Sequence, residues 1–142
     1  MRAKIGSGNS KPPSEVRAGW LAVLMGLSWL GMLVHNQVEL PQLPILSPEY
    51  LLPTLMSAGL FLAWYLQARF RPLWSKLIIL WTGMHLLIGG ILSVLPLPVW
   101  PFYPEQSLGH YLAHLFYTAS QVPLIWYLGR SAVGRLMRHR TS

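Results

Sequence analysis

The chain has 142 residues, of which 53% are hydrophobic and 11% are charged, and its formal net charge at pH 7 is +7. The apolar residues are gathered in blocks instead of being dispersed with an amphipathic period, which excludes a soluble globular class. The sequence contains no cysteine, so thiol–disulfide exchange, thiolate metal sites and iron–sulfur clusters are excluded as well.

Four apolar stretches follow one another along the chain, at residues 18–35, 50–67, 77–96 and 109–129. Each is close to the roughly 20 residues that a helix needs to cross a hydrocarbon core about 30 Å thick. The sequence therefore predicts an all-α integral membrane protein with a bundle of four transmembrane helices across residues 18–129. Residues 1–17 and 130–142 are expected to be basic tails, of which the first is flexible.

Basic and acidic residues alternate from one connection to the next. Lysines and arginines precede the first stretch, separate the second from the third and follow the fourth, whereas the connections 36–49 and 97–108 carry only Glu39, Glu49 and Glu105 as charges. The positive-inside rule then places the basic segments, and so both termini, in the cytoplasm. The sequence therefore predicts a multi-pass protein located in the bacterial cytoplasmic membrane.

The basic residues flank helix ends, where they meet anionic lipid headgroups, so we expect a bilayer and not a nucleic acid as their partner. The segment after the fourth stretch is predicted to contact headgroups or a partner protein through Arg130, Arg135, Arg138 and Arg140.

Polar residues recur at helical spacing in the third and fourth stretches. Those of the fourth lie at i, i+4, i+7 and i+11, and those of the third at i, i+3 and i+11, so each set shares one helical face. We expect both faces to turn away from lipid. Their members are His110, His114, Tyr117 and Gln121 in the fourth stretch, and Thr82, His85 and Ser93 in the third.

The histidines have a structural and a functional interpretation. The favoured one is structural: His85 and His114 hydrogen-bond across helices and hold the bundle together. The functional one is a cofactor, because imidazole ligates haem iron, zinc and copper. His85 and His114 would then bind haem, or His35 and His110, with Glu39 or Glu49, would form a shallow divalent-metal site.

Depth separates these sites. A rise of 1.5 Å per residue places His85 about 16 Å below the outer end of its helix and His114 about 9 Å below its own, whereas two axial haem ligands should lie at similar depth. His35 and His110 both lie within about 3 Å of the outer surface by the same arithmetic.

The sequence shows no nucleophile paired with a base, no paired carboxylates and no phosphate-binding loop, so an enzyme is the class with least support. The favoured function is an accessory, assembly or scaffolding subunit that docks to other membrane subunits or to itself. Two alternatives stay open. One is a self-sufficient haem- or metal-binding protein, and the other is an oligomeric transporter or channel for protons or a small solute.

Overall fold

A computed structural model describes residues 13–99 and 104–140, except for the side chains of 13–16 and 132–140. All of its regular structure is helical. A 3₁₀ turn, η1, precedes α3, and a π-helical segment, η2, continues α3 without a break. The elements in chain order are α1 (Pro13–Glu39), α2 (Pro48–Leu66), η1 (Ala68–Phe70), α3 (Arg71–Met84), η2 (His85–Leu92) and α4 (Leu108–Arg140).

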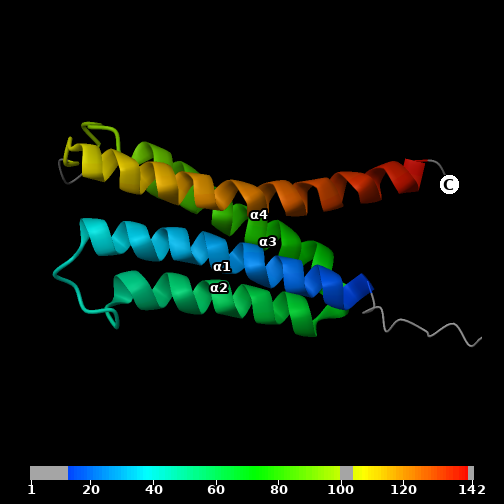
Figure 1. Cartoon of the computed structure of the whole chain (residues 1–142). Helices are drawn as coiled ribbons and strands as arrows, with labels where there is room; N and C mark the ends of the chain where they lie inside the picture. The colour runs from blue at the N-terminus through cyan, green and yellow to red at the C-terminus, as the bar shows by residue number, and fades with distance from the viewer. Residues whose placement is uncertain (1–12, 100–103, 141–142) are drawn as a thin grey trace, which may run out of the picture.

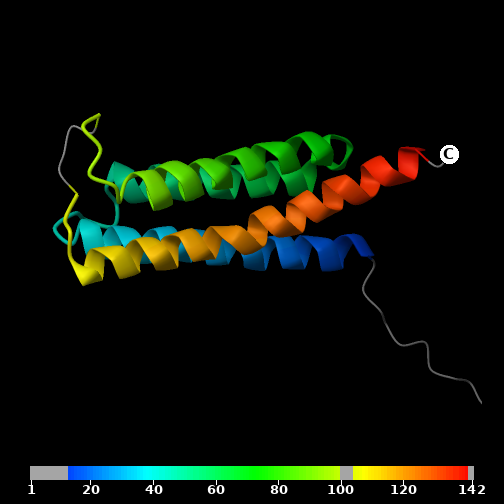
Figure 2. The same cartoon turned by 90° about the horizontal axis from the view of Figure 1, so that it is seen from above.

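The four long helices form one bundle, because α1 packs against α2 and α4, and α3 packs against the same two helices. Figures 1 and 2 show that α1 begins and α4 ends at the same end of the bundle, where α2 also connects to α3. We call this the basic end, since Arg17 near the start of α1, Arg69 between α2 and α3, and Arg130 in the last third of α4 belong to it. The opposite end holds the α1–α2 and α3–α4 connections, with Glu39 and Glu105, and we call it the acidic end.

Prolines lie at the starts of three helices, and the first of them, Pro13, begins α1. Pro48 and Pro72 lie in the first turns of α2 and α3, where a missing N–H leaves no helical hydrogen bond unmade. Glu49 adds a negative charge to the first turn of α2, which complements the helix dipole.

Two helical stretches of the described chain are long and apolar enough to cross a membrane, Arg17–Glu39 with 23 residues and Ala68–Leu92 with 25. All four long helices carry large apolar side chains on their outer faces. Examples are Val23, Leu62, Leu80 and Leu115, which are 61%, 54%, 61% and 64% exposed.

The observed bounds differ from the predicted ones at several ends. α1 begins at Pro13 and ends at Glu39, and the third helix runs from Arg71 to the end of η2 at Leu92, whereas 77–96 was expected. α4 continues past 129 to Arg140, because the residues that follow are mostly good helix formers and include no proline. Of the predicted N-terminal tail, residues 1–12 lie outside the described part of the chain.

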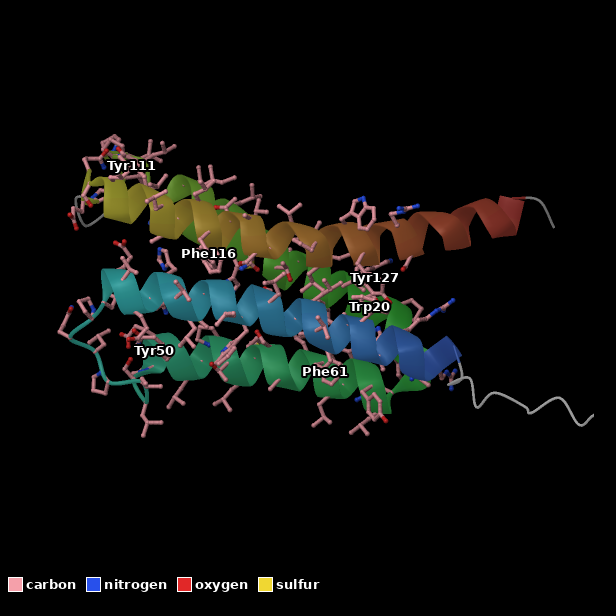
Figure 3. All side chains as sticks on the ribbon, viewed as in Figure 1. Trp20, Tyr50, Phe61, Tyr111, Phe116 and Tyr127 are labelled. Carbon is pink, nitrogen blue, oxygen red and sulfur yellow. The ribbon has the colours of Figure 1, made fainter. Side chains whose placement is uncertain are left out.

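The interior changes character along the bundle. Towards the basic end it is an apolar core, built around Leu21, Ile78, Leu124 and their neighbours. Towards the acidic end the buried residues include histidines and other polar side chains. In Figure 3, Tyr50 and Tyr111 lie near the acidic end, and Trp20 and Tyr127 lie nearer the basic end.

Candidate metal centre

A close contact between α1 and α4 positions the site. A Cβ atom built on Gly31 would lie 1.8 Å from the Oγ of Ser120, so only glycine allows the two backbones to come this near. The polar face of α4 is buried in this contact. Its members His110, His114, Tyr117 and Gln121 are 5%, 5%, 4% and 1% exposed.

The outermost layer of the site pairs His110 with Glu39, the last residue of α1. The Nδ1 of His110 lies 2.8 Å from Oε2 of Glu39. An ionised carboxylate only accepts hydrogen bonds, so Nδ1 carries a hydrogen, and in the neutral imidazole the lone pair is on Nε2. That Nε2 atom is buried and has no hydrogen-bond partner among the described residues.

One turn deeper, the Nε2 atoms of His35 and His114 face each other at 3.2 Å. The Nδ1 of His114 lies 3.1 Å from the carbonyl oxygen of Gly90, which can only accept, so this Nδ1 donates. The Nδ1 of His35 lies 3.1 Å from Oδ1 of Asn36. Because Asn36 donates through Nδ2 to the carbonyl of Glu49, its Oδ1 accepts and His35 donates through Nδ1 as well. Both facing Nε2 atoms of the neutral imidazoles therefore carry lone pairs.

The π-helical segment η2 supplies the carbonyl that holds His114. In this segment the backbone bonds lengthen to i→i+5, as from the Ser93 N–H to the Ile88 carbonyl at 3.0 Å. Gly90 lies against α4, and a Cβ on it would come within 2.4 Å of Thr118 Oγ1. Such π segments are rare and are frequent at functional sites.

Tyr117 lies beneath these histidines. Its hydroxyl hydrogen-bonds Nδ1 of His85, and its ring lies 4.8 Å from the ring of His35, centroid to centroid. Gly89 leaves room for the tyrosine, because a Cβ there would be 3.0 Å from its hydroxyl. Deeper still, Ser28 of α1 donates a hydrogen bond to Gln121.

The donor set fits a transition-metal ion. Single ligand atoms of Glu39, His110 and His114 lie within 4.8 Å of one another. Two nitrogens at about 2.05 Å from a tetrahedral zinc ion are about 3.3 Å apart, and the Nε2 atoms of His35 and His114 are at 3.2 Å. A cavity of about 390 Å³ adjoins the cluster. It is lined by His35, Glu39, Leu40, Ser93, Pro104, Glu105, His110 and His114.

The structure groups the sequence-selected histidines differently from either predicted pair. His35 and His110 line the same cavity, but the ligand atoms that all lie within 4.8 Å of one another are those of Glu39, His110 and His114, and His35 joins the site through its contact with His114. Glu49 reaches this region through its backbone carbonyl. His85 and His114 have separate partners, and the cavity beside His85 holds about 10 Å³, roughly the space of one water molecule. Apart from the Gly89-Gly90 pair itself, no sequence pattern predicts the role of the Gly90 carbonyl.

The other predicted site residues lie outside the cluster or at its edge. Thr82 donates to the carbonyl of Ile78, and Ser93 lines the cavity and donates to the carbonyl of Gly89. The guanidinium of Arg130 lies 4.7 Å from the ring centre of Trp126. The side chains of Arg135, Arg138 and Arg140 lie outside the described residues.

Comparison of the chain with protein-family models, with curated proteins and with solved structures found no match.

Proposed function

We propose that this chain is a multi-pass membrane protein that binds a divalent transition-metal ion at the acidic end of its bundle. The observation that carries the proposal is the pair of Nε2 lone pairs of His35 and His114, opposed at 3.2 Å. Such an arrangement is repulsive until a cation lies between the two atoms. A single proton could fill that role, but His110 adds a third imidazole, and its ring centroid lies 4.4 Å from that of His114. Its unpartnered Nε2 favours an ion with several ligands.

In this proposal each ligand imidazole is oriented by a partner on its other nitrogen. Glu39 holds His110, the Gly90 carbonyl holds His114, and Asn36 holds His35. Metal-binding histidines have this second hydrogen bond almost always, because it fixes the tautomer and the direction of the ring. Three imidazoles without a thiolate suit zinc, copper or nickel more than calcium or magnesium.

Membrane integration is supported by the distribution of charge and apolar surface. The bundle has apolar outer faces. Arg17, Arg69 and Arg130 lie at one end, and Glu39, Glu49 and Glu105 lie at the other. By the positive-inside rule the basic end, with both termini, faces the cytoplasm and the metal site lies at the outer surface. A bacterial cytoplasmic membrane fits this topology.

The experiment is a zinc titration of the full-length protein, purified in detergent, by isothermal calorimetry. We expect one zinc ion per chain, and more than a 100-fold loss of affinity in His35→Ala and in His114→Ala, because each removes one imidazole ligand. His139→Ala is the matched control, since residue 139 lies in the last turn of α4, at the basic end of the bundle. Glu39→Gln should lower the affinity by about 10- to 100-fold through the orientation of His110.

Two results would contradict the proposal. One is the absence of zinc, copper or nickel binding to correctly folded protein. The other is a stoichiometric site that His35→Ala and His114→Ala leave unchanged.

A role as an accessory subunit is a second candidate, and the exposed apolar connections favour it. Ile45, Leu46 and Val99 are 65%, 76% and 74% exposed outside the four long helices, and they could be covered by a partner at the acidic end. Gentle extraction from the native membrane followed by mass spectrometry tests it. Stoichiometric recovery with other membrane subunits supports this function, and recovery of the chain alone counts against it.

A transport function has less support than metal binding or a role as an accessory subunit. The polar layers reach inward only as far as Ser28 and Gln121, and the apolar core around Leu21, Ile78 and Leu124 follows them towards the basic end. A through path would require that core to open.

A further inference from the structure

The cavity beside the histidines is larger than a metal ion requires. It has a volume of about 390 Å³, whereas a water molecule takes up about 30 Å³ and an apolar cavity of about 150 Å³ holds a benzene ring. Its walls come from the end of α1, the residue after η2, the α3–α4 connection and the start of α4. His35, His110 and His114 all line it. An ion held by these three imidazoles would therefore lie at the wall of a space that has room for a further molecule.

The three imidazoles leave one position of a tetrahedral ion unfilled, and the other polar side chains of the cavity do not supply a fourth ligand. Glu39 is engaged at 2.8 Å with Nδ1 of His110, and the ion binds the opposite nitrogen of that ring. Ser93 donates its hydroxyl to a backbone carbonyl. Glu105 is exposed and is not in the group of ligand atoms that lie within 4.8 Å of one another among the described residues. Zinc ions with three protein ligands keep their fourth position for water or a substrate.

The charges around the ion favour a ligand with a single negative charge. A divalent ion bound by three neutral imidazoles keeps both of its positive charges, and the carboxylate of Glu39 beside His110 offsets one of them. A monoanion completes the balance, which matters because a partly buried site penalises uncompensated charge. A dianion would also meet the carboxylate of Glu105 on the cavity wall. A cation would be repelled by the metal ion itself.

The remaining walls of the cavity suit a ligand with a carbon skeleton. Leu40 and Pro104 are apolar and line the cavity beside the polar groups, so an organic anion can bury part of its skeleton against them. Its carboxylate oxygen is a ligand that zinc accepts at about 2.0–2.2 Å. The cavity lies at the acidic end of the bundle, which the proposed topology places on the outer side of the membrane.

We propose that the metal ion keeps one coordination position open to this cavity, and that an organic monocarboxylate from the outer aqueous phase binds the ion there through one oxygen atom. The inference rests on the metal-binding function proposed above and adds a ligand to that site. Binding exchanges a metal-bound water for the carboxylate oxygen, so no bond within the ligand breaks and nothing is oxidised or reduced.

The test uses the full-length protein in detergent, loaded with cobalt(II), which replaces zinc and whose visible absorption depends on its ligands. Benzoate is titrated into the cobalt protein, and benzamide, which has nearly the same shape without the charge, is its neutral counterpart. Leu40→Trp narrows the cavity at its wall. Leu46→Trp is the matched control, because Leu46 lies in the same connection between α1 and α2 and does not line the cavity.

We expect benzoate to change the cobalt spectrum until one molecule is bound per chain, and benzamide to change it little. Leu40→Trp should weaken benzoate binding about 10-fold by crowding the cavity, with cobalt binding retained, and Leu46→Trp should alter neither. A cobalt spectrum that benzoate leaves unchanged would overturn the open position while the metal site stands. An equal response to benzamide, or equal benzoate affinity in the two variants, would overturn the binding of a monocarboxylate in this cavity. Failure of cobalt and zinc to bind would overturn the metal site itself, and this inference with it.

Discussion

Gln121 shows how a single buried amide ties α4 to α1. Its Oε1 accepts a hydrogen bond from the Ser28 hydroxyl, and its Nε2 donates to the Ser28 carbonyl at 3.1 Å. With 1% of its surface exposed, it has no contact with water that could replace these bonds.

Gln121→Leu should therefore lower the free energy of unfolding by about 1–2 kcal/mol, because it leaves the Ser28 hydroxyl without its acceptor. Zinc affinity should stay unchanged, since the ligand imidazoles are more than a helical turn away. Thermal unfolding in detergent, alongside a zinc titration, measures both. A selective loss of zinc affinity at unchanged stability would mean that Gln121 belongs to the site.

The sequence predicted which polar residues share one face of a helix. It did not predict which side chains of the other helices they contact. The spacing of His110, His114, Tyr117 and Gln121 indicated a common inward face, and all four are buried. The sequence pairs His35 with His110, whereas in the structure His35 contacts His114. Which of the two histidines it meets depends on the rotation of α1 against α4. That rotation is set by the fit of Gly31 to Ser120, which no pattern within one helix reveals.

Gly31 lies at a close contact between the helices α1 and α4. Gly31→Ala would force a Cβ into Ser120 and should cost about 1–3 kcal/mol of stability. Gly19→Ala on the same helix is the matched control, because its Cβ meets no atom within 4 Å. Chemical unfolding of both variants gives the comparison. Equal stability of the two would show that α1 and α4 do not pack as described.

The π-helical segment η2 is the other element on which the site depends. Gly90→Val should push η2 away from Thr118 and displace the carbonyl that orients His114, lowering zinc affinity about 10-fold. Gly83→Val in α3, where a Cβ meets no atom within 4 Å, should leave the affinity unchanged. Equal zinc affinities in the two variants would show that the Gly90 carbonyl does not orient His114 for metal binding.

Helix positions followed from the sequence because blocks of apolar residues and opening prolines are local signals. The π segment did not, since the extra residue per turn is stabilised by contacts with α4 and not by local propensity. The sequence predicts the end of the fourth helix near residue 129, because the composition changes there from apolar to basic, whereas α4 continues to Arg140.

The proposed topology predicts that the acidic end of the bundle is accessible from outside the cell and that the basic end is not. The natural chain lacks cysteine, so single cysteines can be introduced without background. In intact cells, Gln106→Cys at the acidic end should react with a membrane-impermeant maleimide, and Gln67→Cys at the basic end should react only after lysis. Both positions are exposed. Reaction of both in intact cells, or the reverse pattern, would contradict the proposed orientation.

The proposed site requires the imidazoles of His35, His110 and His114 to bind one metal ion, and X-ray absorption at the zinc edge measures these ligands. The zinc-loaded protein should show nitrogen or oxygen ligands at about 2.0–2.1 Å. It should also show the multiple-scattering pattern of three imidazole rings, reduced to two in His114→Ala. A ligand shell without imidazole scattering, or one that His114→Ala leaves unchanged, would rule out the three-imidazole site.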